Sequence, residues 1–118
     1  MAILSIVLQI LLGLGFLIFG FSKFNSPQMV EGFKHFGYPG WFRIFTGVVE
    51  VVAAILLFIG IWNTTFAAWG GLLIVVTMIG AILTHIKIKD TLQGMMMPII
   101  LFILGLIVLV VNGGSLFG

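Results

Sequence analysis

The chain has 118 residues, of which 62% are hydrophobic and only 7% are charged. Soluble domains carry about 25% charged residues, and a chain this short leaves too much surface exposed to keep its apolar side chains away from water. The composition therefore excludes a soluble domain and predicts a one-domain integral membrane protein whose main partner is the lipid bilayer. The formal net charge of +2 comes from the connections between apolar runs and does not indicate nucleic-acid binding.

Four apolar runs predict four transmembrane helices in one domain that covers residues 1–118. A helix crosses a hydrocarbon core of about 30 Å with about 20 residues. Lipid admits only helices and closed barrels, and these runs lack the alternation of barrel strands. The predicted fold is all-α, an antiparallel four-helix bundle, with helices near residues 2–23, 41–62, 66–87 and 91–112.

A short amphipathic helix is predicted between the first two membrane helices, over residues 27–36. Ser26 is a suitable N-cap, Pro27 suits the first helical position, and Gly37 suits the end. Two interpretations remain open: a connector that lies in the membrane interface, or a lid over a cavity between the helices.

The connection between the third and fourth membrane helices ends in another helix-start pattern. Asp90 and Gln93 stand at capping-box spacing, so the last helix is expected to begin near Thr91.

The basic residues predict the orientation of the chain. All of them lie in or beside the first and third connections, whereas the turn at 61–65 and the C-terminal NGGSLFG carry none. The positive-inside rule then places the charged loops in the cytoplasm and both termini outside a cell membrane. The residues that set this bias are Lys23, Lys34, Arg43, Lys87 and Lys89.

Glu50 is the one charged residue inside an apolar run. Small and polar residues recur at helical spacing on each helix, and membrane helices pack through such residues, so these stripes and Glu50 should face the bundle interior. The stripes comprise Ser5, Gln9, Gly13, Phe16, Gly20 and Lys23; Arg43, Gly47, Glu50 and Ala54; Gly70, Thr77, Ala81 and His85; and Pro98, Gly105 and Asn112.

Helical rise places Glu50 near the membrane midplane and predicts a central pocket around it. The candidate ligand-binding or proton-handling residues are Glu50, Thr77 and Phe16 in the wall, Gln9 as the floor, and Lys23, Arg43 and His85 at the cytoplasmic mouth. Their alternative roles are structural: interfacial anchors for the cations, and backbone bonding or packing for Thr77 and Gln9.

A charged carboxylate at this depth costs several kcal/mol, so it is either protonated or supported by a cation or water. Arg43 lies two turns away on the same helix, and Lys23 is a comparable partner. If Glu50 only joined two helices by a hydrogen bond, the gain would be about 0.6 kcal/mol, which favours a functional role.

No metal site and no covalently bound cofactor are predicted. The chain has no cysteine and only two histidines, and His35 falls on the predicted surface helix, so a haem held by His35 and His85 is not expected. The methionines at 95–97 have no histidine or cysteine near them in sequence and indicate packing.

The segments LLGLGFLIFGFSKF, GYPGW, FTGVVEVVAAILL and GGLLIVVTMIGAILTH resemble the DoxX family over nearly the whole chain. The resemblance implies a small four-helix membrane protein in which Gly20, Lys23, Pro39, Gly47 and Glu50 occupy recurring positions. It also implies an association with quinone-reducing oxidoreductases and with stress responses to quinones, catechols and thiols.

Three classes of function follow. The preferred one is a membrane subunit or accessory protein that binds a quinone, a quinol or another apolar small molecule near Glu50. It would work with a partner redox or detoxification enzyme and would not be a catalyst on its own. In that role Phe16 or Phe36 would stack on the ligand ring.

The alternatives are a proton-coupled transporter and a non-catalytic assembly or scaffold protein, either of which could form homo-oligomers. Small multidrug transporters have four helices and one membrane glutamate, but theirs lies in the first helix, where this chain has Gln9.

Overall fold

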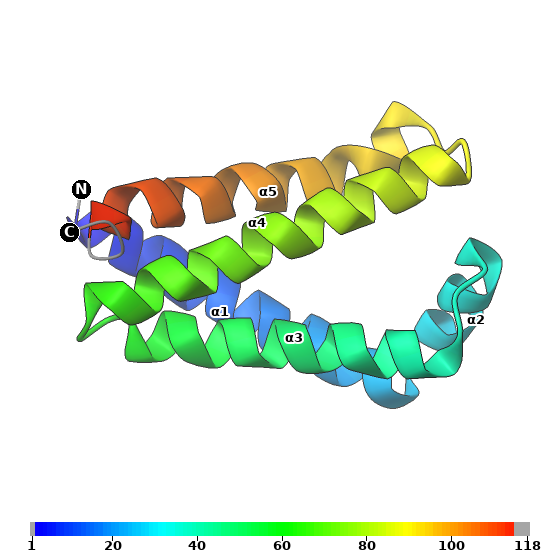
Figure 1. Cartoon of the computed structure of the whole chain (residues 1–118), viewed down its shortest axis with the longest axis horizontal. Coiled ribbons are helices and arrows are strands. Elements are labelled where there is room, and N and C mark those ends of the chain that lie inside the picture. Colours follow the sequence, from blue (N-terminus) through cyan, green and yellow to red (C-terminus); the bar gives the residue numbers. More distant parts are fainter. Residues whose placement is uncertain (1, 115–118) are drawn as a thin grey trace.

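The computed structural model describes residues 2–114 and shows an all-α fold (Figure 1). Four long helices and one short helix make up the described chain, which confirms the predicted fold class. They are α1 (Ala2–Asn25), α2 (Pro27–Phe36), α3 (Gly40–Ile59), α4 (Thr64–Lys87) and α5 (Leu92–Asn112). The long helices α1, α3, α4 and α5 are each long and apolar enough to cross a membrane. The chain is therefore a multi-pass membrane protein.

Capping residues set the helix ends at the two short connections. Asn63 accepts a hydrogen bond from the amide of Thr65 at 3.0 Å, so α4 begins at Thr64, earlier than the expected residue 66. The expected capping box of Asp90 and Gln93 is wrong, because Thr91 caps α5 by accepting from Gly94 at 3.1 Å. The Asp90 carboxylate bonds to His85 instead.

The first connection forms the expected short helix α2. Pro27 occupies its first turn and Ser26 the N-cap position, although the Ser26 hydroxyl makes no capping hydrogen bond. Gly37 ends the helix in the left-handed conformation, with φ of 84°, which a residue without Cβ adopts at little cost.

The helices pair as α1 with α3 and α4 with α5, and the two pairs diverge like the arms of a V (Figure 1). They converge where α3 turns into α4: a Cβ on Gly60 would lie 2.5 Å from the nitrogen of Ala67. At the opposite end the pairs separate, and α2 lies across that end. The divergence leaves room between α3 and α4 in the half of the molecule that carries the charged connections.

Glycines bring the helices of each pair into backbone contact. A Cβ on Gly47 would lie 2.8 Å from the carbonyl oxygen of Gly20. A Cβ on Gly71 would lie 3.0 Å from the carbonyl oxygen of Gly105. Small residues let membrane helices approach this closely, and these contacts fix where α1 crosses α3 and α4 crosses α5.

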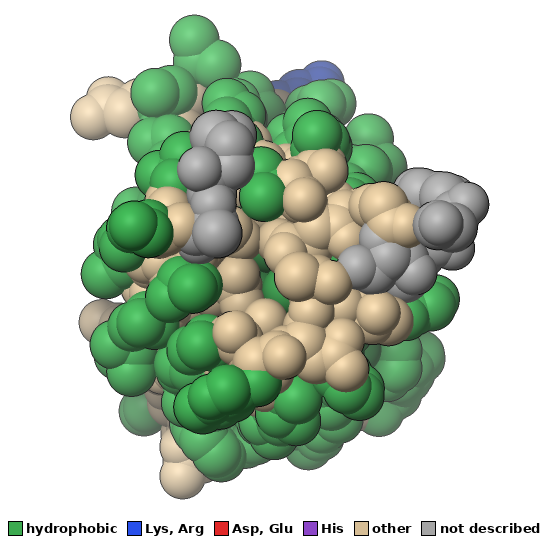
Figure 2. Space-filling view, turned by 90° about the vertical axis from the view of Figure 1, so that its left-hand side faces the viewer, with side chains coloured by type: hydrophobic (Ala, Val, Ile, Leu, Met, Phe, Trp, Pro, Cys, Tyr) green, Lys and Arg blue, Asp and Glu red, His purple; other side chains and the backbone are tan. Residues whose placement is uncertain are grey.

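The end of the molecule that carries the α3–α4 turn presents mostly hydrophobic side chains and uncharged polar atoms. Viewed from this side, the described surface is green and tan, with blue only at its upper margin (Figure 2). The basic residues Lys34 of α2, Lys87 at the end of α4 and Lys89 after it lie at the opposite end. The two ends of the bundle thus differ sharply in charge.

Candidate functional site

A buried ion pair joins α1 and α3. The Lys23 ammonium lies 2.6 Å from Oε1 of Glu50, and the two side chains are only 14% and 3% exposed. Within residues 2–114 that oxygen accepts no hydrogen bond from another group. Because α1 and α3 run in opposite directions, the close contact of Gly20 with Gly47 places the Cβ of Lys23 beside Gly47, 3.1 Å from a Cβ built there, and the long lysine side chain reaches from that point to Glu50.

Arg43 supports this pair without contacting Glu50. Its guanidinium donates to the carbonyl oxygens of Lys23 and Phe24, the second at 2.8 Å. These carbonyls belong to the last turn of α1, where backbone acceptors lack helical partners and a cation is favourable. Arg43 thereby anchors α3 to the end of α1 that carries Lys23.

A cavity of about 680 Å³ lies between α2, α3 and α4, with the ion pair in its wall. Most of the lining is apolar, and aromatic rings contribute a large part of it, while the polar groups come from threonines, His85 and the ion pair. Its lining includes Met29, Phe33, Phe36, Tyr38, Phe42 and Thr77. Such a cavity suits a ligand with an apolar body and a small polar end.

The cavity reaches the outer surface between α3 and α4. Phe45 of α3 and Val76 and Leu83 of α4 line it and are also 55%, 58% and 60% exposed. Because these helices span the membrane, their exposed apolar faces meet lipid. The opening therefore lies on the apolar outer surface of the bundle.

A second cavity, of about 260 Å³, lies on the other side of the ion pair, between α1, α4 and α5. Phe16, Met97, Pro98 and Leu101 contribute to its wall. Residues common to both cavities form the boundary between them; they are Lys23, Met29, Glu50, Met78, Ala81 and His85.

Contacts from the connection after α2 hold it against α4. The hydroxyl of Tyr38 lies 2.8 Å from Oγ1 of Thr84 and is the donor, because Thr84 gives its own proton to the carbonyl of Gly80. Lys87 donates to the carbonyl of Phe36 at 3.2 Å and lies over the Tyr38 ring, 4.7 Å from its centre. These contacts fasten Phe36 and Tyr38, which line the larger cavity, to the end of α4.

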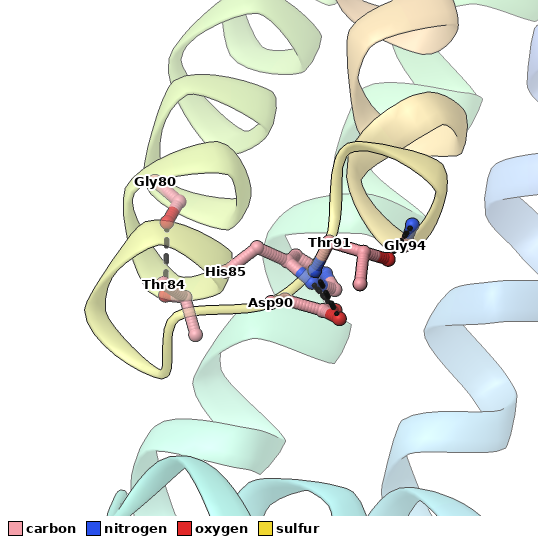
Figure 3. A network of polar contacts seen from close by, with 6 residues as sticks. All are labelled: Gly80, Thr84, His85, Asp90, Thr91 and Gly94. Carbon is pink, nitrogen blue, oxygen red and sulfur yellow. Dashed lines mark hydrogen bonds and ion pairs between the residues drawn. The ribbon is translucent and has the colours of Figure 1, made fainter.

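His85 and Asp90 form a second polar pair near the same end (Figure 3). Nδ1 of His85 lies 2.7 Å from Oδ2 of Asp90, and Oδ1 of Asp90 accepts from the amide of Thr91 at 2.8 Å. The hydrogen bond from His85, followed by that from Thr91, holds the pKa of the Asp90 carboxyl below its usual range. The carboxylate is therefore ionised at neutral pH.

Gln9 belongs to a polar network near the opposite end of the molecule. It donates to the carbonyl of Leu57 at 3.0 Å and accepts from the hydroxyl of Ser5 at 2.7 Å, and Asn112 donates to Ser5 at 2.9 Å. All three polar side chains are buried. This network ties α1, α3 and α5 together.

The structure brings some of the predicted site residues together and separates others. Glu50, Lys23, Thr77 and His85 line the larger cavity, and Phe16 lines the smaller one. Gln9 and Arg43 line neither, so Gln9 is not the floor of the larger cavity and Arg43 is not at its mouth.

Phe36, predicted to stack on a ligand ring, lines the larger cavity, whereas the other aromatic residues of its wall are absent from the prediction. These are Phe33, Tyr38, Phe42 and Phe45, and the density of aromatic residues over 33–45 was a visible signal for them. The spacing of Asp90 to Gln93 indicates a helix cap and gives no sign of the bond between Asp90 and His85. Among the described residues, no cluster of three His, Asp or Glu side chains gathers at a metal-binding distance.

Comparison with known proteins gives the chain a family. The model of the DoxX-like family matches residues 7–108. Over 83 residues the chain is 39% identical to "Uncharacterized protein YdgD" of Bacillus subtilis (strain 168), covering 70% of this chain and 73% of that protein. It is 28% identical over 91 residues to "Putative oxidoreductase CatD" of the same organism, covering 76% of this chain and 64% of that protein. No solved structure matches the chain significantly. With most of its length matched by the family model, the chain belongs to the DoxX-like family.

Proposed function

We propose that the protein binds a quinone-like or similar apolar small molecule in the larger cavity and serves as a membrane subunit or accessory protein of a redox or detoxification enzyme. The single observation that carries this proposal is a desolvated Lys23–Glu50 pair in the wall of a mostly apolar cavity of about 680 Å³. The ammonium would donate to a carbonyl or hydroxyl oxygen of the ligand. The rings of Phe33 and Phe42 would contact its apolar body.

The opening between α3 and α4 supports a ligand that arrives from the bilayer. A molecule dissolved in lipid would pass Phe45, Val76 and Leu83 without entering water. Its polar end would then meet Lys23 and Glu50. This route selects for small amphiphiles whose bulk is apolar.

The redox association rests on the relative named as an oxidoreductase, CatD. A quinone-like ligand changes state by exchanging electrons, which cofactors supply and amino-acid side chains seldom do. A separate enzyme that docks at the membrane would provide them. The ligand and that partner are both parts of this proposal.

We also propose an orientation with the charged connections in the cytoplasm. The basic residues gather at the end where α2 and the α4–α5 connection lie, and α1 begins and α5 ends at the other end. The positive-inside rule assigns the basic end to the cytoplasm. The opening of the larger cavity would then lie in the cytoplasmic half of the bilayer.

The test is ligand-dependent thermal stability in mild detergent, with 2,3-dimethyl-1,4-naphthoquinone and tetraphenylphosphonium as probes. A ligand that binds only the folded protein raises its melting temperature by mass action. We expect the quinone to raise that of the wild type by several degrees. Glu50→Gln should weaken this rise, and Gly80→Phe should abolish it, because Gly80 lines the cavity with open space where a Cβ would stand.

Gly15→Phe is the matched control. Gly15 also lies in a membrane helix with no atom within 4 Å of a built Cβ, but it lines neither cavity. Equal loss of the quinone effect in both phenylalanine variants would contradict the site. A response to tetraphenylphosphonium alone would favour a transporter. If neither probe shifts the wild type and Glu50→Gln is as stable as the wild type, the scaffold role would replace this proposal.

A further inference from the structure

His85 occupies a position from which it faces both cavities. It lies in the last turn of α4, and its side chain lines the larger cavity and the smaller one together with Glu50 and Lys23. Its Nδ1 is engaged by the Asp90 carboxylate at 2.7 Å. Nε2 is then the ring nitrogen that remains for a molecule in either cavity.

The backbone after α4 fixes Asp90 in place. Lys89 adopts the left-handed conformation, with φ of 58°, and reverses the chain so that the Asp90 amide donates to the carbonyl of His85 at 2.9 Å. The carboxylate is held a second time by the amide of Thr91, the residue that caps α5. Asp90 is thus tied to the start of α5 and to the end of α4 (Figure 3).

This arrangement determines which nitrogen of His85 carries the proton. An ionised carboxylate can only accept, so Nδ1 must donate to it, and the neutral ring then presents an unprotonated Nε2. Exposure falls along the polar residues in steps: 30% for the Asp90 side chain, 21% for His85, 14% for Lys23 and 3% for Glu50. His85 is therefore the imidazole that touches both water and the cavities.

We propose that Nε2 of His85 hydrogen-bonds the polar end of the bound molecule, as a donor when the ring is charged and as an acceptor when it is neutral, and that Asp90 is its positioning residue. This rests on the proposed function, since it requires a ligand in the cavity. When the ring is charged, its Nε2–H donates to an oxygen of the ligand, and no covalent bond breaks. When the ring is neutral, Nδ1 keeps its proton for Asp90, and Nε2 can accept from a ligand hydroxyl instead.

Other titratable and charged groups face His85 from each element around it. Lys23 comes from α1, Glu50 from α3, and Tyr38 from the connection between α2 and α3. His35 of α2 lies near enough to Asp90 for their charges to interact. Lys87 follows His85 by two residues on α4. The described part of α5 carries no charged side chain. Imidazole is the group among them that ordinarily titrates between pH 5 and 8.

The experiment measures the dissociation constant of 2,3-dimethyl-1,4-naphthoquinone from pH 5 to 8 in micelles, because this probe has no ionisable group. If the His85 imidazolium donates to it, binding in the wild type should tighten as pH falls, by at most about tenfold per pH unit, because binding takes up no more than one proton. His85→Gln should remove this dependence. His35→Gln, which changes the other histidine of the chain, should keep it. The Asp90→Asn variant should still bind the probe, but the pH at which its dissociation constant changes should shift. In the Asp90→Glu variant that pH should return part of the way to the wild-type value.

Two results would overturn the proposal: a flat profile in the wild type, or an unchanged profile in His85→Gln. If the quinone does not bind at any pH, the proposed function fails. The His85–Asp90 pair is then tested separately, by histidine-selective ¹⁵N labelling of the ligand-free protein, which shows which ring nitrogen carries the proton. The neutral His85 ring should then carry its proton on Nδ1, and its titration should change in Glu50→Gln. A ring protonated on Nε2, or one insensitive to Glu50→Gln, would show that His85 does not serve the cavity.

Discussion

Lys23 and Glu50 are charged residues that depend on each other, because each would be costly to bury alone in the membrane. Their side chains are almost entirely removed from solvent, and they meet at 2.6 Å. Removing one partner of a buried ion pair typically costs about 3–5 kcal/mol, whereas replacing both with apolar groups is often neutral. Substitutions of these two residues therefore test how much the buried ion pair contributes to the stability of the fold.

We expect Lys23→Met to lower the free energy of unfolding by about 3–5 kcal/mol, since it leaves the Glu50 carboxylate without a cation. Unfolding by a denaturing detergent would measure it. Lys34→Met is the control, because Lys34 and Glu31 form an exposed pair at 3.7 Å, and such pairs contribute about 0–1 kcal/mol. The double variant Lys23→Met with Glu50→Met should recover most of the loss. Equal effects of the two lysine substitutions would show that the buried pair is not special.

The inward direction of Glu50 was predictable, but its partner was not. The stripe of small and polar residues on α1 and α3 marks the buried faces, and Gly20, Gly47 and Glu50 are buried. Sequence spacing left both Arg43 and Lys23 as cations within reach. The choice depends on where α1 crosses α3, and on the free carbonyls at the end of α1 that attract Arg43.

At the scale of the elements, the crossing of α1 and α3 depends on the lack of side chains at two positions. Gly20 and Gly47 place each backbone against the other, three residues before Lys23 and Glu50. A methyl group at Gly47 would meet the carbonyl of Gly20 at 2.8 Å, and a backbone atom cannot turn away as a side chain can. The ion pair is thus a product of helix packing.

Gly47→Ala should lower the melting temperature and weaken quinone binding together, because α3 must move away from α1 and carry Glu50 with it. Thermal unfolding in detergent and the quinone titration would measure the two effects. Gly15→Ala supplies the comparison: its Cβ would meet open space, and alanine favours a helix over glycine by up to about 1 kcal/mol. That variant should be as stable as the wild type or more so. Retained stability and binding in Gly47→Ala would disprove the packing argument.

The helices themselves follow from length and hydropathy, but their divergence does not. Depths counted from helix ends assume parallel axes, and on that assumption Gln9 lay beneath Glu50 in one pocket. Because α3 and α4 separate toward the charged end, the larger cavity forms there, beside α2, and Gln9 bonds to Leu57 outside it. Apolar periodicity identifies the buried face of a helix, but it gives no information about the angle at which two helices cross.

For the molecule as a whole, the asymmetry between its ends predicts how it sits in the membrane. One end joins α3 to α4 by a turn without charge, and the other carries the basic connections and α2. The turn includes Trp62, which is 84% exposed and suits a membrane interface. The orientation can be measured directly, because the chain has no cysteine to interfere with labelling.

Single-cysteine variants Trp62→Cys and Lys34→Cys should label from opposite sides of the membrane. In intact cells, a membrane-impermeant maleimide should modify residue 62, while residue 34 should react only after the cells are permeabilised. Lys34 is suitable because its side chain is 69% exposed. The reverse pattern would invert the orientation and place the opening of the larger cavity in the outer half of the bilayer.

The pairing of Lys23 with Glu50 also bears on how the chain is made. Ribosomes deliver α1 before α3, so the cation of the pair reaches the membrane while the acid is still unsynthesised. An unaccompanied carboxylate is among the least favourable groups for a helix to carry into lipid. The lysine at the end of α1 is therefore in place as a counterion when α3 leaves the insertion machinery, and the order of synthesis favours correct assembly of this pair.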